Sequence, residues 1–192
     1  MQKVILAGAV MQDMDQVALG PRTFPGPGKV VFMSRLNPMH VEAVIDLINH
    51  GPFFRHLSMR VKDMGTGYSL VELDMANEHL NPFGGIHGGA YASAIDTAAY
   101  WALYCEMEDG AGLTSLDLNI DFLAPASNGK LVIKGQSVKV GRSICLGEAA
   151  AVDMEGRLLA RGSSKLMVTQ GLQTIQEVVR FTGEGNLPPK FI

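Results

Sequence analysis

The chain has little cysteine, no cluster of basic residues and no long apolar run, and each absence excludes a class of protein. Its 192 residues include two cysteines, Cys105 and Cys145, without the Cys-x-x-Cys or Cys–His spacing of a zinc site. A disulfide framework or a metal centre therefore has no support. We expect buried free thiols in a reducing compartment and no bound metal.

The charges argue against a nucleic-acid partner. Lysine and arginine number 16 against 19 aspartates and glutamates, the net charge is −3, and no basic cluster is longer than two residues. A protein that binds nucleic acid through its phosphates needs a basic patch. We expect no nucleic acid among the partners.

No apolar window approaches the roughly 20 residues that a helix needs to cross a bilayer. The apolar run from Val4 to Val10 is short, has one lysine before it and is followed by Asp13 and Asp15, so it is a poor export signal. The simplest interpretation is a cytoplasmic protein without a membrane span.

Apolar residues make up 47% of the chain and charged residues 18%, which is enough for one core with a surplus for subunit contacts. The length suits one domain with an appended segment. Glycine and proline at 20–21 and 24–28 are strong loop signals. We therefore predict an N-terminal extension at 1–38, a domain at 39–170 and a C-terminal tail at 171–192.

The pattern of apolar residues predicts an α+β protein. An amphipathic helix begins near Asn37-Pro38 and ends at His50-Gly51, a long helix covers Ala90 to Cys105, and a short one lies within 173–180. Strands are predicted at 57–61, 68–75, 114–123, 130–140, 144–153 and 157–168. Because the last four strands have no helices between them, we predict an antiparallel meander.

The stretch Asn81-Pro82-Phe83-Gly84-Gly85-Ile86-His87-Gly88-Gly89 leads into the long, alanine-rich helix. Its glycines let backbone approach closely. A helix start presents unpaired N–H groups and the positive end of the helix dipole. Such an end suits an anion, or an oxygen that becomes negative during a reaction.

One carboxylate, Asp96, interrupts the small apolar residues of this helix. A structural aspartate there bonds neighbouring backbone or faces water. A functional one is a base or nucleophile close to donors for an oxyanion. The residues alone leave both interpretations open.

These residues resemble the signature of hotdog-fold acyl-CoA thioesterases of the His-Gly-Gly branch, which includes phenylacetyl-CoA-type and 4-hydroxybenzoyl-CoA-type enzymes. The resemblance covers about residues 40–168. Its four elements are Asn81 six residues before the histidine, His87-Gly88-Gly89, Asp96 nine residues after the histidine, and the strand from Thr114 to Pro125. It implies a hotdog fold, in which a curved antiparallel sheet wraps one long helix.

The resemblance also implies hydrolysis of acyl-CoA or aryl-CoA thioesters to the free acid and coenzyme A, without a cofactor. The backbone N–H of Gly88 then polarises the thioester carbonyl, and Asp96 of the partner chain attacks directly or activates water. Asn81 holds the loop or orients water, with a plain turn residue as the alternative. Ser115 matches a position near the acid, and Thr114 is the second choice.

Four further positions belong to the expected site. His87 is expected to bond backbone at the helix start. Gly89, Lys139 and Arg142 are the candidates for binding coenzyme A, the last two because related enzymes place basic residues in the corresponding turn. A solvated hairpin tip explains these two basic residues equally well.

The spacing of Gly88 and Asp96 predicts an oligomer. Eight residues correspond to about 12 Å along a helix, so one thioester cannot contact both on one helix. Two antiparallel helices across a twofold axis can bring the start of one near the middle of the other. We expect a homodimer or a dimer of dimers, as in the resembling enzymes.

Two other functions stay open. An enoyl-CoA hydratase-type hotdog enzyme would use a catalytic histidine side chain at a different distance from the aspartate. A non-catalytic acyl-CoA sensor would typically lack the buried acid or carry a DNA-binding segment. Residues 1–38 show neither a helix-turn-helix pattern nor a basic excess.

Overall fold

The computed structural model describes residues 35–183 and 186–192, which belong to one compact unit. The predicted N-terminal extension therefore lies, apart from its last residues, outside the described part of the chain. The elements are α2 (Pro38–Asn49), α3 (Pro52–His56), β1 (Met59–Gly65), β2 (Tyr68–Asp74), η2 (Asn77–His79), α4 (Gly88–Tyr104), β3 (Ala111–Phe122), β4 (Lys130–Lys139), β5 (Ile144–Val152), β6 (Leu158–Gln170) and α5 (Ile175–Thr182).

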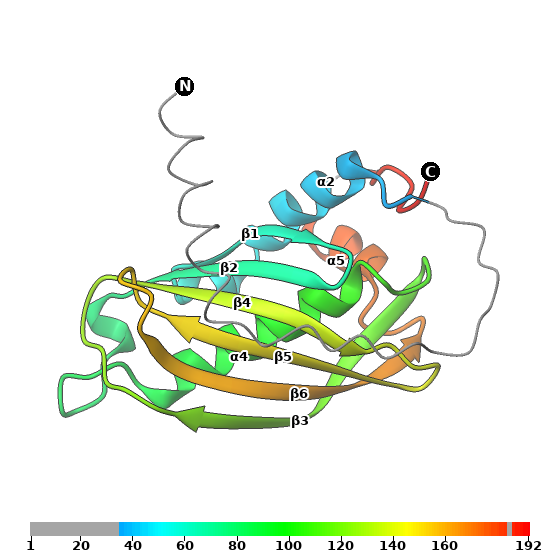
Figure 1. Ribbon diagram of the computed structural model, residues 1–192. Helices are drawn as coiled ribbons and strands as arrows, with labels where there is room; N and C mark the ends of the chain where they lie inside the picture. Colours follow the sequence, from blue (N-terminus) through cyan, green and yellow to red (C-terminus); the bar gives the residue numbers. More distant parts are fainter. Residues whose placement is uncertain (1–34, 184–185) are drawn as a thin grey trace. The chain divides into compact units, whose positions relative to one another are not determined.

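The six strands form one antiparallel sheet in the order β1-β2-β4-β5-β6-β3 (Figure 1). The prediction of antiparallel pairing is confirmed, and β4, β5 and β6 form a meander as predicted, but β3 is not the next strand of it. β4 pairs with β2, and β3 pairs with β6 at the far edge of the sheet. The reason is α4, which joins β2 to β3 and carries the chain across the sheet before β3 begins.

The long helix α4 packs along one face of this sheet, behind the strands in the view of Figure 1. Ala98 and Ala99 are fully buried. Gly135 in β4 and Gly147 in β5 lie against them so closely that a Cβ atom at either glycine would strike the helix backbone. The alanines of the helix and these strand glycines therefore set the short distance between helix and sheet, and the predicted arrangement of one long helix on an antiparallel sheet is confirmed.

Helix α2 begins and ends where the sequence predicts. The Asn37 side chain accepts a hydrogen bond from the Met39 N–H at 3.1 Å, and Pro38 occupies the first turn, where its missing N–H costs nothing. The buried face of α2 packs on β1 and contacts α5. Helix α2 is therefore a second helix that packs against the sheet, in addition to α4.

The last residues of the chain pack against the end of α4. Helix α5 follows β6, in agreement with the predicted short helix. Lys190 is 2% exposed, and its Nζ donates to the carbonyl oxygens of Tyr104 and Met107 at 2.7 and 2.8 Å. These bonds satisfy carbonyl groups at the C-terminal end of α4. The predicted boundary between domain and tail at residue 170 stays a prediction.

Both cysteines are free and buried, as the sequence predicts. Burial raises the pKa of the Cys105 thiol to about 12, so this thiol is not reactive at neutral pH. Within the described residues, no helix is both long and apolar enough to span a bilayer.

Candidate active site

Asn81 holds the loop that leads into α4. Its Oδ1 accepts hydrogen bonds from the N–H groups of Phe83 and Gly85 at 2.9 and 3.3 Å, and its own N–H donates to the Gly85 carbonyl at 2.7 Å. The loop-holding contact expected from the sequence is therefore present. The Nδ2 group of Asn81 donates to no described residue, which leaves it free for a ligand.

His87 caps α4, as expected. Its Nδ1 accepts a hydrogen bond from the Gly89 N–H at 2.9 Å. This bond uses the N–H of Gly89, whereas the N–H of Gly88 has no acceptor among the described residues. A Cβ atom at Gly88 would lie 3.0 Å from the ring of Phe122. The free N–H at the helix start therefore belongs to Gly88, in a position that a side chain would crowd.

A cavity of about 390 Å³ opens at the start of α4. Gly88 and Asn81 line it together with Tyr91, Phe122 and the loop 123–126. The structure thus brings together two of the predicted site residues and their unused N–H donors. A helix start with free donors suits an oxygen that gains negative charge.

Asp96 accepts hydrogen bonds from two serines on neighbouring strands. Ser115 Oγ lies 3.0 and 3.1 Å from the two carboxylate oxygens, and Ser164 Oγ donates to Oδ1 at 2.6 Å. Hydrogen bonds to a charged acceptor are stronger than those between neutral groups. The structure therefore places Ser115 beside the acid, as expected, and the two hydroxyls hold the carboxylate in one orientation.

A β-bulge in β3 accompanies the Ser115 contact. The pairing of β3 with β6 shifts between Ser115 and Asp117, so that Leu116 has no residue opposite it. A bulge adds one residue to a strand and changes the direction of the side chains beside it. Ser115 lies directly before this irregularity and faces Asp96.

Ser164 is a hydrogen-bond partner of Asp96 that was not predicted from the sequence. This serine is fully buried in β6, and Leu118 in β3 is its partner across the strand pair. The sequence gives one indication of a polar contact here, because a hydroxyl stands at an inward-facing strand position among small and apolar residues. This pattern does not identify the acceptor of the hydrogen bond, because only the arrangement of β6 beneath α4 brings Ser164 to Asp96.

A second cavity, of about 470 Å³, lies beside Asp96 between α2, α3, α4 and α5. Asp96 and Thr97 contribute polar groups to its wall. The apolar side chains that line it include Leu47, Phe54, Trp101, Ile175, Val178 and Phe181. Burial raises the pKa of Tyr100, which also lines the cavity, to about 12, and the charge of Asp96 adds to this rise. The cavity therefore combines two carboxylates, Asp96 and Glu177, with a largely apolar wall.

Within one chain, the structure does not bring Gly88 and Asp96 together. They line different cavities, in agreement with their separation of about 12 Å along the helix. β3 pairs only with β6, so its other edge has no partner among the described strands. Leu116 and Phe122 are 52% and 58% exposed on this strand.

Lys139 and Arg142 are exposed at the end of β4 and in the turn before β5. No described residue forms an ion pair with either. This turn lies beside the C-terminal end of α4, where Cys145 Sγ is 3.8 Å from Met107 Sδ. The two basic residues therefore do not lie at the Gly88 cavity of the same chain.

The described residues contain no group of three or more histidine, cysteine, aspartate or glutamate side chains that could hold a metal ion. The hydrogen-bond partners of Asp96 among the described residues are hydroxyl groups. This set suits a carboxylate that reacts with an organic substrate or with water.

Comparison with known proteins gives one consistent result. A family model described as the thioesterase superfamily matches residues 83–160. Acyl-coenzyme A thioesterase 13 of Homo sapiens is 34% identical over 101 residues, which cover 50% of this chain and 69% of the relative. The matched segment contains the loop before α4, the helix itself and four of the six strands in whole or part.

Solved structures show the same fold. A thioesterase from Haemophilus influenzae superposes with a TM-score of 0.66 at 22% identity, over 73% of this chain and 97% of that one. A hypothetical thioesterase from Streptococcus pneumoniae, solved with coenzyme A, gives a TM-score of 0.54 at 25% identity, over 60% and 88% of the two chains. The expected hotdog fold is confirmed, and the chain belongs to the thioesterase superfamily of thioester hydrolases.

Proposed function

We propose that the protein hydrolyses acyl-CoA or aryl-CoA thioesters to the free acid and coenzyme A, as an enzyme of the His-Gly-Gly branch. The observation that carries this proposal is the Asp96 carboxylate, held by Ser115 and Ser164 at the wall of an apolar cavity. A reacting group beside an apolar space suits a substrate that joins a reactive carbonyl to an apolar chain or ring.

Two routes are compatible with this carboxylate. In the first, a carboxylate oxygen of Asp96 bonds the carbonyl carbon, the C–S bond breaks, the thiolate of coenzyme A leaves, and water hydrolyses the resulting anhydride. In the second, the carboxylate takes a proton from water, whose oxygen attacks the same carbon; the C–S bond then breaks, and the thiolate of coenzyme A leaves with the proton that the carboxylate returns. In both, the free Gly88 N–H stabilises the negative charge that forms on the carbonyl oxygen.

The complete site is proposed to form between two chains, in a homodimer or a dimer of dimers. Gly88 and Asp96 line separate cavities of one chain, and the β3 edge with its exposed Leu116 and Phe122, which pairs with no other described strand, would meet a second copy. An antiparallel partner would bring the start of one α4 to the middle of the other.

Lys139 and Arg142 are proposed to bind the phosphates of coenzyme A. Both are exposed, and neither forms an ion pair with a described carboxylate. Arginine in particular matches the geometry of phosphate oxygens. Gly89 is expected to contribute less to the binding of coenzyme A, because its N–H already donates a hydrogen bond to His87 Nδ1.

Incubation of the purified full-length protein with acyl-CoAs of two to sixteen carbons, phenylacetyl-CoA and 4-hydroxybenzoyl-CoA tests this function. Release of coenzyme A, detected with a thiol reagent, is the expected result. Binding without turnover of any substrate would instead support the acyl-CoA sensor. Loss of the enoyl absorbance of an enoyl-CoA without release of free thiol would support the hydratase.

A further inference from the structure

Tyr91 carries a buried hydroxyl group without a hydrogen-bond partner. The residue lies in the first turns of α4 and is 4% exposed, and no described residue bonds its hydroxyl. Leaving a buried donor unpaired costs free energy, because the group gave up its hydrogen bonds to water on folding. An unpaired hydroxyl at this place therefore indicates a partner that binds later.

The hydroxyl belongs to a residue that lines the cavity at the helix start. Gly88 and Asn81 line the same cavity, and each has an N–H group without an acceptor among the described residues. The ring of Phe122 meets the Tyr91 ring edge to face, with their centroids 6.0 Å apart. This apolar contact holds the phenol ring against the side chain of Phe122.

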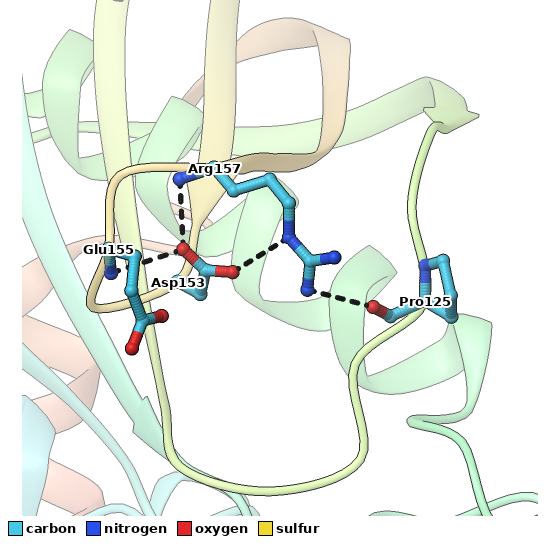
Figure 2. A network of polar contacts seen from close by, with 4 residues as sticks. All are labelled: Pro125, Asp153, Glu155 and Arg157. Carbon is cyan, nitrogen blue, oxygen red and sulfur yellow. Dashed lines mark hydrogen bonds and ion pairs between the residues drawn. The ribbon is translucent and has the colours of Figure 1, made fainter.

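A network of polar contacts lies next to Pro125, one of the residues that line the cavity (Figure 2). Asp153 accepts hydrogen bonds from the Arg157 N–H at 2.8 Å, from Arg157 Nε at 2.9 Å and from the Glu155 N–H at 3.2 Å. Arg157 also donates to the Pro125 carbonyl at 3.2 Å. This network joins the β5–β6 turn to the loop of Pro125, which lines the cavity, and the Tyr91 hydroxyl takes no part in it.

The phenol is a donor across the physiological range of pH. Burial raises its pKa, which outweighs the lowering by the charge of Arg157. A neutral phenol in a dry site donates one strong hydrogen bond to a carbonyl oxygen.

We propose that the Tyr91 hydroxyl donates a hydrogen bond to a carbonyl oxygen of the thioester substrate, as a third donor beside the Gly88 N–H and the Asn81 amide. The inference rests on the proposed function, because it takes the ligand of this cavity to be an acyl-CoA. Such a substrate offers two kinds of carbonyl oxygen, that of the thioester and those of the two amides in the pantetheine arm. Both are acceptors, and kinetics separate them.

The test is Tyr91→Phe, which removes the hydroxyl and keeps the ring against Phe122. The matched control is Tyr68→Phe, since Tyr68 lies in neither cavity and its hydroxyl donates to Asp63 at 3.2 Å. Steady-state kinetics, thermal unfolding and the Kd of a non-hydrolysable analogue with CH₂ in place of the thioester sulfur are measured for both variants and the wild type.

Tyr91→Phe is expected to lower kcat/KM about tenfold or more with a melting temperature equal to or above that of the wild type. A fall in kcat assigns the bond to the thioester oxygen in the transition state, whereas a rise in KM and in the Kd of the analogue assigns it to the pantetheine arm. Tyr68→Phe is expected to keep wild-type kinetics.

A lower melting temperature with unchanged kinetics and analogue binding would overturn the proposal, because it would mean that the hydroxyl bonds a structural water. If the wild type turns over no acyl-CoA but binds the analogue, the proposed reaction is wrong, and the analogue affinities of the two variants still decide the role of Tyr91. If the wild type neither reacts with nor binds these compounds, both the proposed function and the proposed role of Tyr91 are wrong.

Discussion

Asp96 is a carboxylate in a helix otherwise built from small apolar residues, and its hydrogen bonds explain how the fold accommodates it. Ser115 and Ser164 together give three short contacts to its two oxygens. These bonds offset part of the cost of removing the charge from water. The carboxylate nevertheless lines an open cavity, which is the position that a base or nucleophile needs.

Asp96→Asn separates a catalytic from a structural carboxylate. The change keeps the shape and an acceptor oxygen but removes the charge. We expect turnover to fall on the order of 100-fold or more, about 3 kcal/mol of barrier, with equal or higher stability because a desolvated charge is gone. Kinetics and urea unfolding measure the two effects. A less stable variant with full activity per folded molecule would show a structural aspartate.

Ser164→Ala tests the residue that only the structure reveals. Its hydroxyl is fully buried and lies 2.6 Å from Asp96 Oδ1, so its loss leaves a charged acceptor with one partner fewer. We expect a loss of about 1–3 kcal/mol of unfolding free energy and a lower kcat, because the carboxylate is no longer held in one orientation. The control is Ser163→Ala, at a neighbouring position without a contact to Asp96, which should change stability by less than about 0.5 kcal/mol.

Helix α5 forms one wall of the apolar cavity, and Val178 is one of its side chains on that wall. Val178→Trp should fill part of the cavity and exclude methylene groups of long acyl chains, each worth about 0.8 kcal/mol. We expect KM for dodecanoyl-CoA to rise about tenfold or more, with less than about threefold change for butanoyl-CoA. Gln176→Trp, on the exposed side of the same helix, is the control. An equal loss at every chain length would mean that the acyl group binds elsewhere.

The segment after α5 is joined to α4 by Lys190, whose burial lowers its pKa to about 8. The unfolded chain keeps this proton up to the ordinary lysine pKa of 10.5, whereas the folded chain releases it near 8. Between these values the unfolded state binds more protons, so this residue makes unfolding free energy rise with pH. Below pH 8 both states are protonated and the contribution is constant.

Urea unfolding of the wild type and Lys190→Met from pH 6 to 10.5 measures this effect. We expect the stability of the wild type relative to the variant to be flat up to about pH 7.5 and then to rise by something on the order of 3 kcal/mol toward pH 10.5. Lys165→Met, at an exposed lysine paired with Asp117, should show no such change. A flat difference throughout would show that the buried ammonium keeps its ordinary pKa.

At the scale of the whole molecule, the separation of Gly88 and Asp96 is the feature with the largest consequence. One chain holds both groups in different cavities, so a shared site predicts complementation between chains. Gly88→Pro removes the donor at the first position of α4, where proline suits a helix and the extended backbone of His87 suits a following proline. Gly88→Ala is its control, since it adds the same crowding against Phe122 but keeps the N–H.

Co-expression of separately tagged Gly88→Pro and Asp96→Asn chains tests the shared site. Each parent should be nearly inactive, and the purified heterodimer should regain one complete site of two, about half the wild-type turnover. A heterodimer that is as inactive as its parents, or an active monomer in light scattering, would contradict the shared site. Gly88→Ala, in contrast, should keep much more activity than Gly88→Pro.

Local patterns in the sequence determined the elements of this protein and the position of its chemistry. Asn37-Pro38 marks a helix start because its cap and its missing N–H act within one turn, and the residues from Asn81 to Asp96 lie on one continuous segment. The contact between His87 and Gly89 spans two residues. Such features follow from short-range hydrogen bonding and helix geometry, so neighbouring residues are sufficient to predict them.

The tertiary structure alone decided the order of the strands and the environment of Asp96. β3 pairs with β6 and not with β4, and Ser164 reaches Asp96 across 68 positions of the chain. Strand pairing depends on which apolar faces can be buried together, and many registers and neighbours satisfy the same alternation of side chains. The buried, unpaired hydroxyl of Tyr91 likewise becomes visible only when every element around it is in place, because a missing partner is a property of the whole surroundings and not of the residue.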